Sequence, residues 1–233
     1  MDDKVKIYIR TYPRSGTHLL STLIHYRYGF SQMTPTFVKP ITNGKDNLEM
    51  YTAHYGETES WGINGRIYVL RNPLDCISSQ YYRRFKPEVT SLDREKFQES
   101  SKSKDHCYPW THNHSGAFEP SVWNEVGAYN EMVKSIDSND LVLYFEDLLH
   151  SPEKVIQSLD SYFLTRFNLN TIDSPKTFEE IKEISFLYYN KEHKALSHSH
   201  HDTNNHQKLK SLIEPYVDKF LYKSNPHLSY YYS

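Results

Sequence analysis

The chain has 233 residues, of which 37% are hydrophobic and 24% charged, with a formal net charge of −2 at pH 7 and two cysteines. This length fits one domain over residues 1–233 with its own core. The charge and the cysteine count exclude a general nucleic-acid binder and a disulfide-stapled secreted protein. Since no apolar run approaches the roughly 20 residues of a membrane-spanning helix, and the acidic N-terminus lacks the apolar core of a signal peptide, we expect a cytoplasmic protein that binds no membrane.

The first predicted strand and helix flank a polar loop at residues 12–18, Tyr-Pro-Arg-Ser-Gly-Thr-His. The apolar residues before the loop have strand spacing, at Val5, Ile7 and Ile9. Those after it have helix spacing, at Leu19, Leu20, Leu23 and Ile24. A strand, a tight loop with Gly and a helix together point backbone N–H groups and the positive end of a helix dipole at an anion. Arg14 adds positive charge, and Ser15 and Thr17 add hydroxyl donors. The loop therefore predicts a phosphate site, although it is not a Walker A motif.

A second strand-to-helix junction is predicted in the middle of the chain. Residues 29–50 contain several Gly, Pro and Thr residues, which predicts a long segment without regular secondary structure. A short strand is expected from Met50 to Tyr55, and the β-branched, apolar segment Arg66–Leu70 predicts a central buried strand. Arg71 follows directly, and Pro73 favours a helix from about Leu74 to Phe85.

The second half of the chain continues the alternation of strands and helices. We expect a strand at residues 141–145, helices over 120–133, from Ser151-Pro152 onward, over 176–188 and over 205–222, and mobile loops at 86–117 and 190–206. This order predicts an α/β fold in which helices flank a central, mainly parallel sheet.

Arg71 and Ser79 form a second candidate anion site. Arg71 ends the predicted central strand, and Ser79 lies eight residues further on in the following helix. A guanidinium and a hydroxyl are suited to hold a phosphate. Two such sites at neighbouring strand ends imply a ligand with two separated phosphates, in the crevice where open α/β sheets bind ligands. A structural alternative pairs Arg71 with Asp75 and leaves Ser79 as a cap or core hydroxyl.

Three segments resemble, in order and spacing, motifs of the sulfotransferases that use 3′-phosphoadenosine 5′-phosphosulfate (PAPS). Residues 12–17 resemble the 5′-phosphosulfate loop of that family, and residues 67–75 with Ser79-Gln80-Tyr81-Tyr82 resemble its 3′-phosphate motif. Residues 144–148 with Ser151-Pro152-Glu153 resemble the strand and helix beside the adenosine. The resemblance implies a single α/β domain related to P-loop nucleotide kinases. It also implies transfer of a sulfuryl group from PAPS to a hydroxyl or amine of a small-molecule acceptor, with 3′-phosphoadenosine 5′-phosphate (PAP) as product and without a metal.

The resemblance also assigns roles to individual residues. It places Arg14, Ser15, Gly16, Thr17 and His18 around the 5′-phosphate, Arg71 and Ser79 around the 3′-phosphate, and Phe145 beside the adenosine. His54, after a short strand between the two phosphate motifs, matches the catalytic base, a task that suits a side chain with a pKa near 6.5. Arg14 is expected to stabilise the leaving group. Glu57 and His18 are the next candidates for the base.

The sequence departs from the cytosolic members of that family in four places. Arg14 replaces the usual Lys, Leu19 stands at the position of an adenine-stacking Trp, and Thr52 stands where a Lys often precedes the His. The C-terminal Arg-Lys-Gly…Gly-x-Trp segment that covers the 3′-phosphate is absent, and the polar run Lys191–His206 takes its place. Arg keeps the charge and the donors of Lys, so we expect the chemistry to be retained.

Other functions remain as alternatives. The histidine-rich segment 198–206 suggests a metal site, but it lacks the helical spacing of zinc motifs and lies among Ser, Asn and Thr, which favours a solvated loop. A P-loop kinase-like phosphotransferase would require the missing Gly-Lys-Ser/Thr. A non-catalytic nucleotide-binding module would not require His54. We expect the protein to be a monomer or a homodimer.

Overall fold

The computed structural model describes residues 4–12, 15–32, 44–53, 62–76, 127, 129–192 and 225–231, without the side chains of residues 186–192. The chain divides into two compact units, each described here by itself. The first comprises Met1–Arg71 and Ile136–Leu196, and the second comprises Asn72–Ser135 and Ser197–Ser233. One domain over the whole chain stays a prediction.

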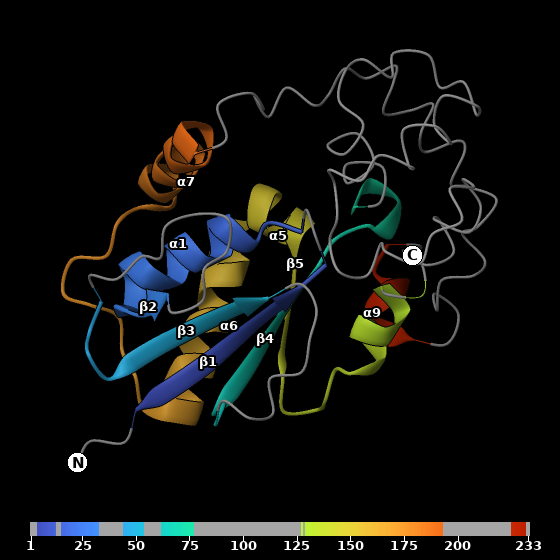
Figure 1. Ribbon diagram of the computed structural model, residues 1–233, viewed down its shortest axis with the longest axis horizontal. Coiled ribbons are helices and arrows are strands. Elements are labelled where there is room, and N and C mark those ends of the chain that lie inside the picture. Colours follow the sequence, from blue (N-terminus) through green and yellow to red (C-terminus); the bar gives the residue numbers. More distant parts are fainter. Residues whose placement is uncertain are drawn as a thin grey trace, which may run out of the picture. The chain divides into compact units, whose positions relative to one another are not determined.

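A five-stranded parallel sheet forms the centre of the first unit (Figure 1). Its strands are β1 (Val5–Thr11), β2 (Ser31–Gln32), β3 (Leu48–Ala53), β4 (Gly65–Leu70) and β5 (Leu141–Tyr144), in the spatial order β2-β3-β1-β4-β5. The central strand β1 pairs with both β3 and β4, and its residues Ile7 and Ile9 are fully buried. The predicted α/β fold with a mainly parallel sheet is therefore confirmed.

One part of the strand prediction is wrong. The segment 29–50, expected to be irregular, contains β2 and the beginning of β3 at Leu48. The two residues of β2 are polar, so they show no apolar alternation, and only pairing with β3 makes them a strand. At its other end β3 extends to Ala53, and the last two residues of the predicted strand, 54 and 55, lie outside the described residues.

Helices α1 (Thr17–Tyr28), α5 (Phe145–His150), α6 (Pro152–Phe167) and α7 (Phe178–Glu192) complete the first unit. In α1 the predicted apolar face is buried at Leu20, Leu23 and Ile24, and Leu19 packs partly buried against the same core. Residues 190–192 form the end of α7, so the prediction of a mobile loop from residue 190 is wrong for these three. They are Asn, Lys and Glu, so no apolar spacing in the sequence marks the end of this helix.

Polar and aromatic contacts hold α1 and α6 together against the sheet, and Figure 1 shows α6 running behind the strands. Arg27 donates two hydrogen bonds to Asp160, at 2.9 and 2.6 Å, and the Tyr28 hydroxyl donates a third at 2.6 Å. The rings of Tyr28 and Phe163 lie 4.3 Å apart between centroids. Burial would raise the pKa of Asp160, but the bonds from Arg27 and Tyr28 outweigh it and lower that pKa.

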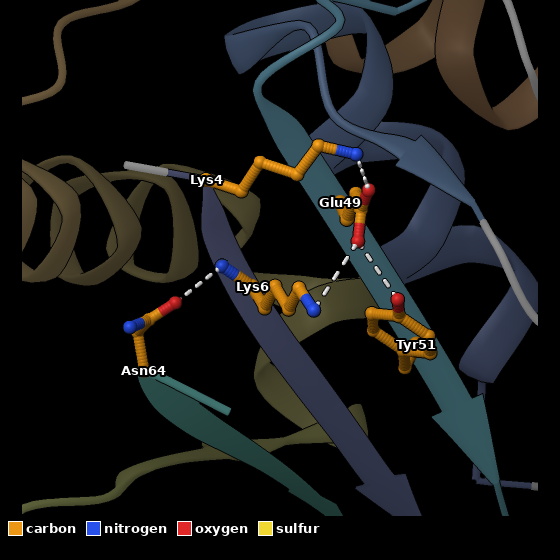
Figure 2. A network of polar contacts seen from close by, with 5 residues as sticks. All are labelled: Lys4, Lys6, Glu49, Tyr51 and Asn64. Carbon is orange, nitrogen blue, oxygen red and sulfur yellow. Dashed lines mark hydrogen bonds and ion pairs between the residues drawn. The ribbon is translucent and has the colours of Figure 1, made fainter. Parts of the chain in front are cut away.

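A polar network ties β1, at its amino end, to β3 and to the segment that leads into β4 (Figure 2). The buried Glu49 carboxylate pairs with Lys4 at 2.5 Å, accepts a hydrogen bond from the Tyr51 hydroxyl at 2.8 Å, and lies 4.0 Å from Lys6 Nζ. The backbone N–H of Lys6 donates to Asn64 Oδ1 at 2.7 Å, and the N–H of Asn64 donates to the Lys6 carbonyl at 2.8 Å. The register of the central strand is therefore fixed at this edge.

The second unit is described in short helical segments. Residues 73–76 are helical, and Asn72 Oδ1 accepts from the Leu74 N–H at 3.0 Å, so a helix begins close to the predicted position. Residues 129–134 are helical, in line with the predicted helix over 120–133, and a short helix, α9, spans Pro226–Ser229. The predictions for 86–117, 193–206 and 205–222 lie outside the described residues. Within the described part of the chain, no helix combines the length and apolar character that crossing a membrane requires.

Candidate functional site

The direction of the strand order changes between β1 and β4. After β1 the chain continues through α1 to β2 and β3 on one side, whereas β5, on the other side, follows β4. Open parallel sheets bind ligands outside the carboxyl ends of the strands at such a switch point. The two candidate anion sites, at the loop after β1 and at Arg71 after β4, flank this position.

The loop after β1 is closed by a backbone hydrogen bond from Ser15 N–H to the Tyr12 carbonyl, at 3.2 Å. Gly16 follows with φ +84°, a left-handed conformation, and occupies the N-cap position of α1. Gly has no side chain to cap the first-turn N–H groups, so the N-cap residue adds no acceptor that would compete with an anion. The structure thus places the predicted Ser15, Gly16, Thr17 and His18 in the loop and the first turn of α1.

Two buried hydroxyls connect the end of β1 to the start of α1. Thr11 Oγ1 and Thr17 Oγ1 lie 2.7 Å apart, and the side chains are buried. The Ser21 hydroxyl donates to the Thr17 carbonyl at 2.8 Å. The orientation of the Thr17 hydroxyl in the candidate phosphate loop is therefore set by the strand before it. Thr11 was not among the predicted site residues, and its signal in the sequence is a polar residue at the end of an otherwise apolar strand face.

The carboxyl ends of the strands lie level with each other. Thr11 pairs with Val69, and Leu70 pairs with Tyr144. Arg71 and Phe145 therefore leave β4 and β5 side by side. Ala53, the last residue of β3, pairs with Arg10, so β3 ends at the same edge.

The Phe145 ring brings the two candidate anion sites together. The guanidinium carbon of Arg71 lies over this ring, 4.7 Å from its centroid, a cation–π contact. A Cβ atom built on Gly16 would lie 2.6 Å from Cε2 of the same ring and closer still to Cδ2, so the ring packs directly on the loop backbone. Three predicted site residues, from three separate segments, thus meet at one place.

Three other predicted site residues, Arg14, His54 and Ser79, lie outside the described residues. Thr52, which stands where the family often has Lys, is buried and accepts a hydrogen bond from Gln32 Nε2 at 3.1 Å. It serves the pairing of β2 and β3. A shallow groove lies elsewhere, between β5 and α6, and its lining includes Lys154, Tyr162 and Arg166 but none of the predicted site residues.

Comparison with known proteins identifies one family. The sequence model of the sulfotransferase domain family matches residues 66–225. This range is more than half of the chain and includes Arg71 and Phe145. Residues 12–18 and His54 precede the matched range. No curated protein matches the sequence. A crystal structure of a sulfotransferase from Alicyclobacillus acidocaldarius aligns at 11% identity and a TM-score of 0.43, covering 91% of this chain and 96% of that one.

Proposed function

The chain belongs to the sulfotransferase domain family, and we propose that it transfers a sulfuryl group from PAPS to a hydroxyl or amine of a small-molecule acceptor, releasing PAP. The observation that carries this proposal is the meeting of Gly16, Phe145 and Arg71 at the carboxyl edge of the sheet. The donor has a phosphate at the 3′ position and a phosphosulfate at the 5′ position of one ribose. Two anion sites separated by a single ring are suited to such a ligand.

The residues of the loop would act on the 5′ side. Backbone N–H groups at the start of α1, together with the Ser15 and Thr17 hydroxyls, would hold the 5′-phosphate. Arg14 would stabilise the negative charge that builds on the phosphate oxygen as its bond to sulfur breaks and the electron pair passes to that oxygen. A phosphate leaving group needs this charge stabilisation more than a proton, so an Arg is adequate.

On the acceptor side, His54 would remove the proton from the acceptor oxygen or nitrogen as that atom forms its bond to sulfur. The strand before it ends at the same sheet edge as the loop after β1, which supports this role. Arg71 and Ser79 would hold the 3′-phosphate and fix the donor in line with the acceptor. This scheme requires no metal. A cytoplasmic location and a monomeric or homodimeric state complete the proposal.

A transfer assay with labelled PAPS against phenols, alcohols, amines and sugars tests the proposal. We expect label in a small acceptor and stoichiometric PAP. Binding of PAP without transfer to any acceptor would favour the non-catalytic nucleotide-binding module, and phosphoryl transfer from ATP would favour the kinase-like alternative. Label found only in polysaccharides would exclude a closed small-molecule pocket.

The base assignment has its own variant. His54→Ala should lower kcat by about 10²–10⁴-fold, the usual contribution of general-base catalysis, while PAP still binds. His150→Ala is the matched control, since His150 is exposed at the end of α5 and should leave kcat unchanged. Near-normal turnover by His54→Ala would move the base to Glu57 or His18.

Arg71→Ala separates the ligand role of Arg71 from the structural alternative. Loss of a charge-assisted bond to the 3′-phosphate typically costs about 1.5–3 kcal/mol, so PAP should bind much more weakly while adenosine 5′-phosphosulfate, which lacks that phosphate, binds almost as before. A loss of thermal stability with equal effects on both ligands would instead support pairing with Asp75.

A further inference from the structure

The Phe145 ring contacts both candidate phosphate sites. It packs on the backbone of Gly16 in the loop after β1, and the guanidinium of Arg71 lies over it from the end of β4. Both side chains are half-buried, at the place where β4 and β5 end side by side. The contact joins residues that directly follow two neighbouring strands but are distant in the sequence.

An aromatic ring under a guanidinium orients the cation without using its hydrogen-bond donors. The five N–H groups of Arg lie in the guanidinium plane, whereas the attraction to a ring acts through the ring face. A long, flexible Arg side chain otherwise loses considerable rotamer entropy when it is fixed against a ligand. A ring that holds the side chain beforehand reduces this cost, so the phosphate meets a cation already in place.

The position of the ring is itself fixed by the loop. Because residue 16 has no side chain, the ring lies directly against the loop backbone. The same ring therefore lies between the Arg71 guanidinium and the start of α1, and it sets the distance between them. On the basis of the function proposed above, we propose that Phe145 is a positioning residue that places Arg71 for the 3′-phosphate and sets the preference of the site for PAP over adenosine 5′-phosphate (AMP).

Positioning of Arg71 by Phe145 and direct contact of Phe145 with the adenine predict different effects on the two ligands. PAP and AMP share the adenosine and the 5′-phosphate and differ only in the 3′-phosphate. Loss of an adenine contact would weaken both ligands by the same factor. Loss of Arg71 positioning would weaken PAP and leave AMP unchanged.

Calorimetric titration of PAP and AMP into the wild type, Phe145→Leu, Phe145→Tyr and Arg71→Ala tests the inference. For Phe145→Leu we expect PAP affinity to fall about threefold to tenfold, in the range of a cation–π contact, with AMP affinity within about twofold of the wild type. Phe145→Tyr keeps the ring and should keep the preference for PAP. In the Arg71→Ala background, Phe145→Leu should change PAP affinity no further.

The possible results are distinguishable. Equal weakening of PAP and AMP by Phe145→Leu, or no change in either, overturns the positioning role while the proposed function stands. Failure of the wild-type protein to bind PAP overturns the proposed function and this inference with it. Melting temperatures show whether each variant folds, and Phe145→Met replaces Phe145→Leu if the latter does not.

Discussion

At Gly16 the backbone and the surroundings both disfavour a side chain. Its φ of +84° is a conformation that costs other residues about 1–2 kcal/mol. A Cβ atom would also overlap the Phe145 ring, and overpacking typically adds about 1–3 kcal/mol. We therefore expect Gly16→Ala to lower the free energy of unfolding by about 2–5 kcal/mol and to weaken PAP binding, as measured by urea denaturation and titration.

Gly62 provides the matched control for this substitution. Its φ is +62°, but no described atom lies within 4 Å of a Cβ built there. Gly62→Ala should thus cost only the backbone part, about 1–2 kcal/mol, and leave PAP binding intact. If the two variants lose equal stability, the contact with Phe145 contributes nothing.

The hydrogen bond between Thr11 and Thr17 gives a second prediction for single residues. Thr11→Val removes the hydroxyl that lies 2.7 Å from Thr17 Oγ1 and keeps the shape of the side chain. We expect a stability loss of about 1 kcal/mol and about a fivefold loss of PAP affinity, because the Thr17 hydroxyl is no longer oriented. Thr22→Val removes a comparable bond, to the His18 carbonyl, and should lower stability alone. Equal effects of both variants on PAP affinity would contradict an orienting role for Thr11.

Among the elements, the contacts of Glu49 at the amino ends of the strands lead to a pH prediction. The hydrogen bond from Lys4 lowers the pKa of Glu49 most, burial opposes it, and the bond from Tyr51 adds to the lowering. A carboxyl whose pKa is lower in the folded state stabilises the protein above its unfolded pKa, about 4.5, and loses this contribution as the pH falls through the folded value. Glu49→Gln should therefore unfold at a lower temperature than the wild type at pH 7, and the difference should shrink below about pH 4.5.

The exposure of the side chains sets the expected size of the Glu49→Gln effect and provides a control variant. The Lys4 side chain is 56% exposed, so solvent screening limits the loss to about 1 kcal/mol at pH 7. Glu179→Gln removes an exposed carboxylate that pairs with Lys182 at 2.9 Å and should change the melting temperature little at any pH. A gap between wild type and Glu49→Gln that stays constant from pH 7 to 3.5 would show that ionisation of Glu49 is not its cause.

At the scale of the whole molecule, local pattern predicted most of the elements and the parallel sheet, but it did not predict β2 or which side chains meet. The loop at 12–18 and the strand before Arg71 could be predicted because alternating apolar residues, Gly and Pro determine backbone structure over only a few residues. The contact of Arg71 with Phe145 depends on the pairing of Leu70 with Tyr144, and long-range parallel pairing leaves no local mark in a sequence. The resemblance to the sulfotransferases named Phe145 as a site residue, but not its contact with the guanidinium.

Ligand binding provides a prediction for the molecule as a whole. PAP that binds only the folded protein should stabilise it by about 2.7 kcal/mol at a concentration one hundred times its Kd, and the melting temperature should rise accordingly. Added Mg²⁺ or EDTA should leave this rise unchanged. An unchanged melting temperature at millimolar PAP would contradict the proposed use of PAPS.

The position of the Glu49 network has a consequence for protein engineering. The network lies at the amino ends of the strands, and the candidate site lies at their carboxyl ends. Stabilising substitutions often reduce activity when they stiffen a catalytic site. Here the contacts around Lys4 and Glu49, at the amino ends of the strands, can be strengthened at a distance from the reacting groups. Directed evolution for new acceptors can therefore begin by adding stability at this edge, which leaves a reserve for destabilising changes around the phosphate loop.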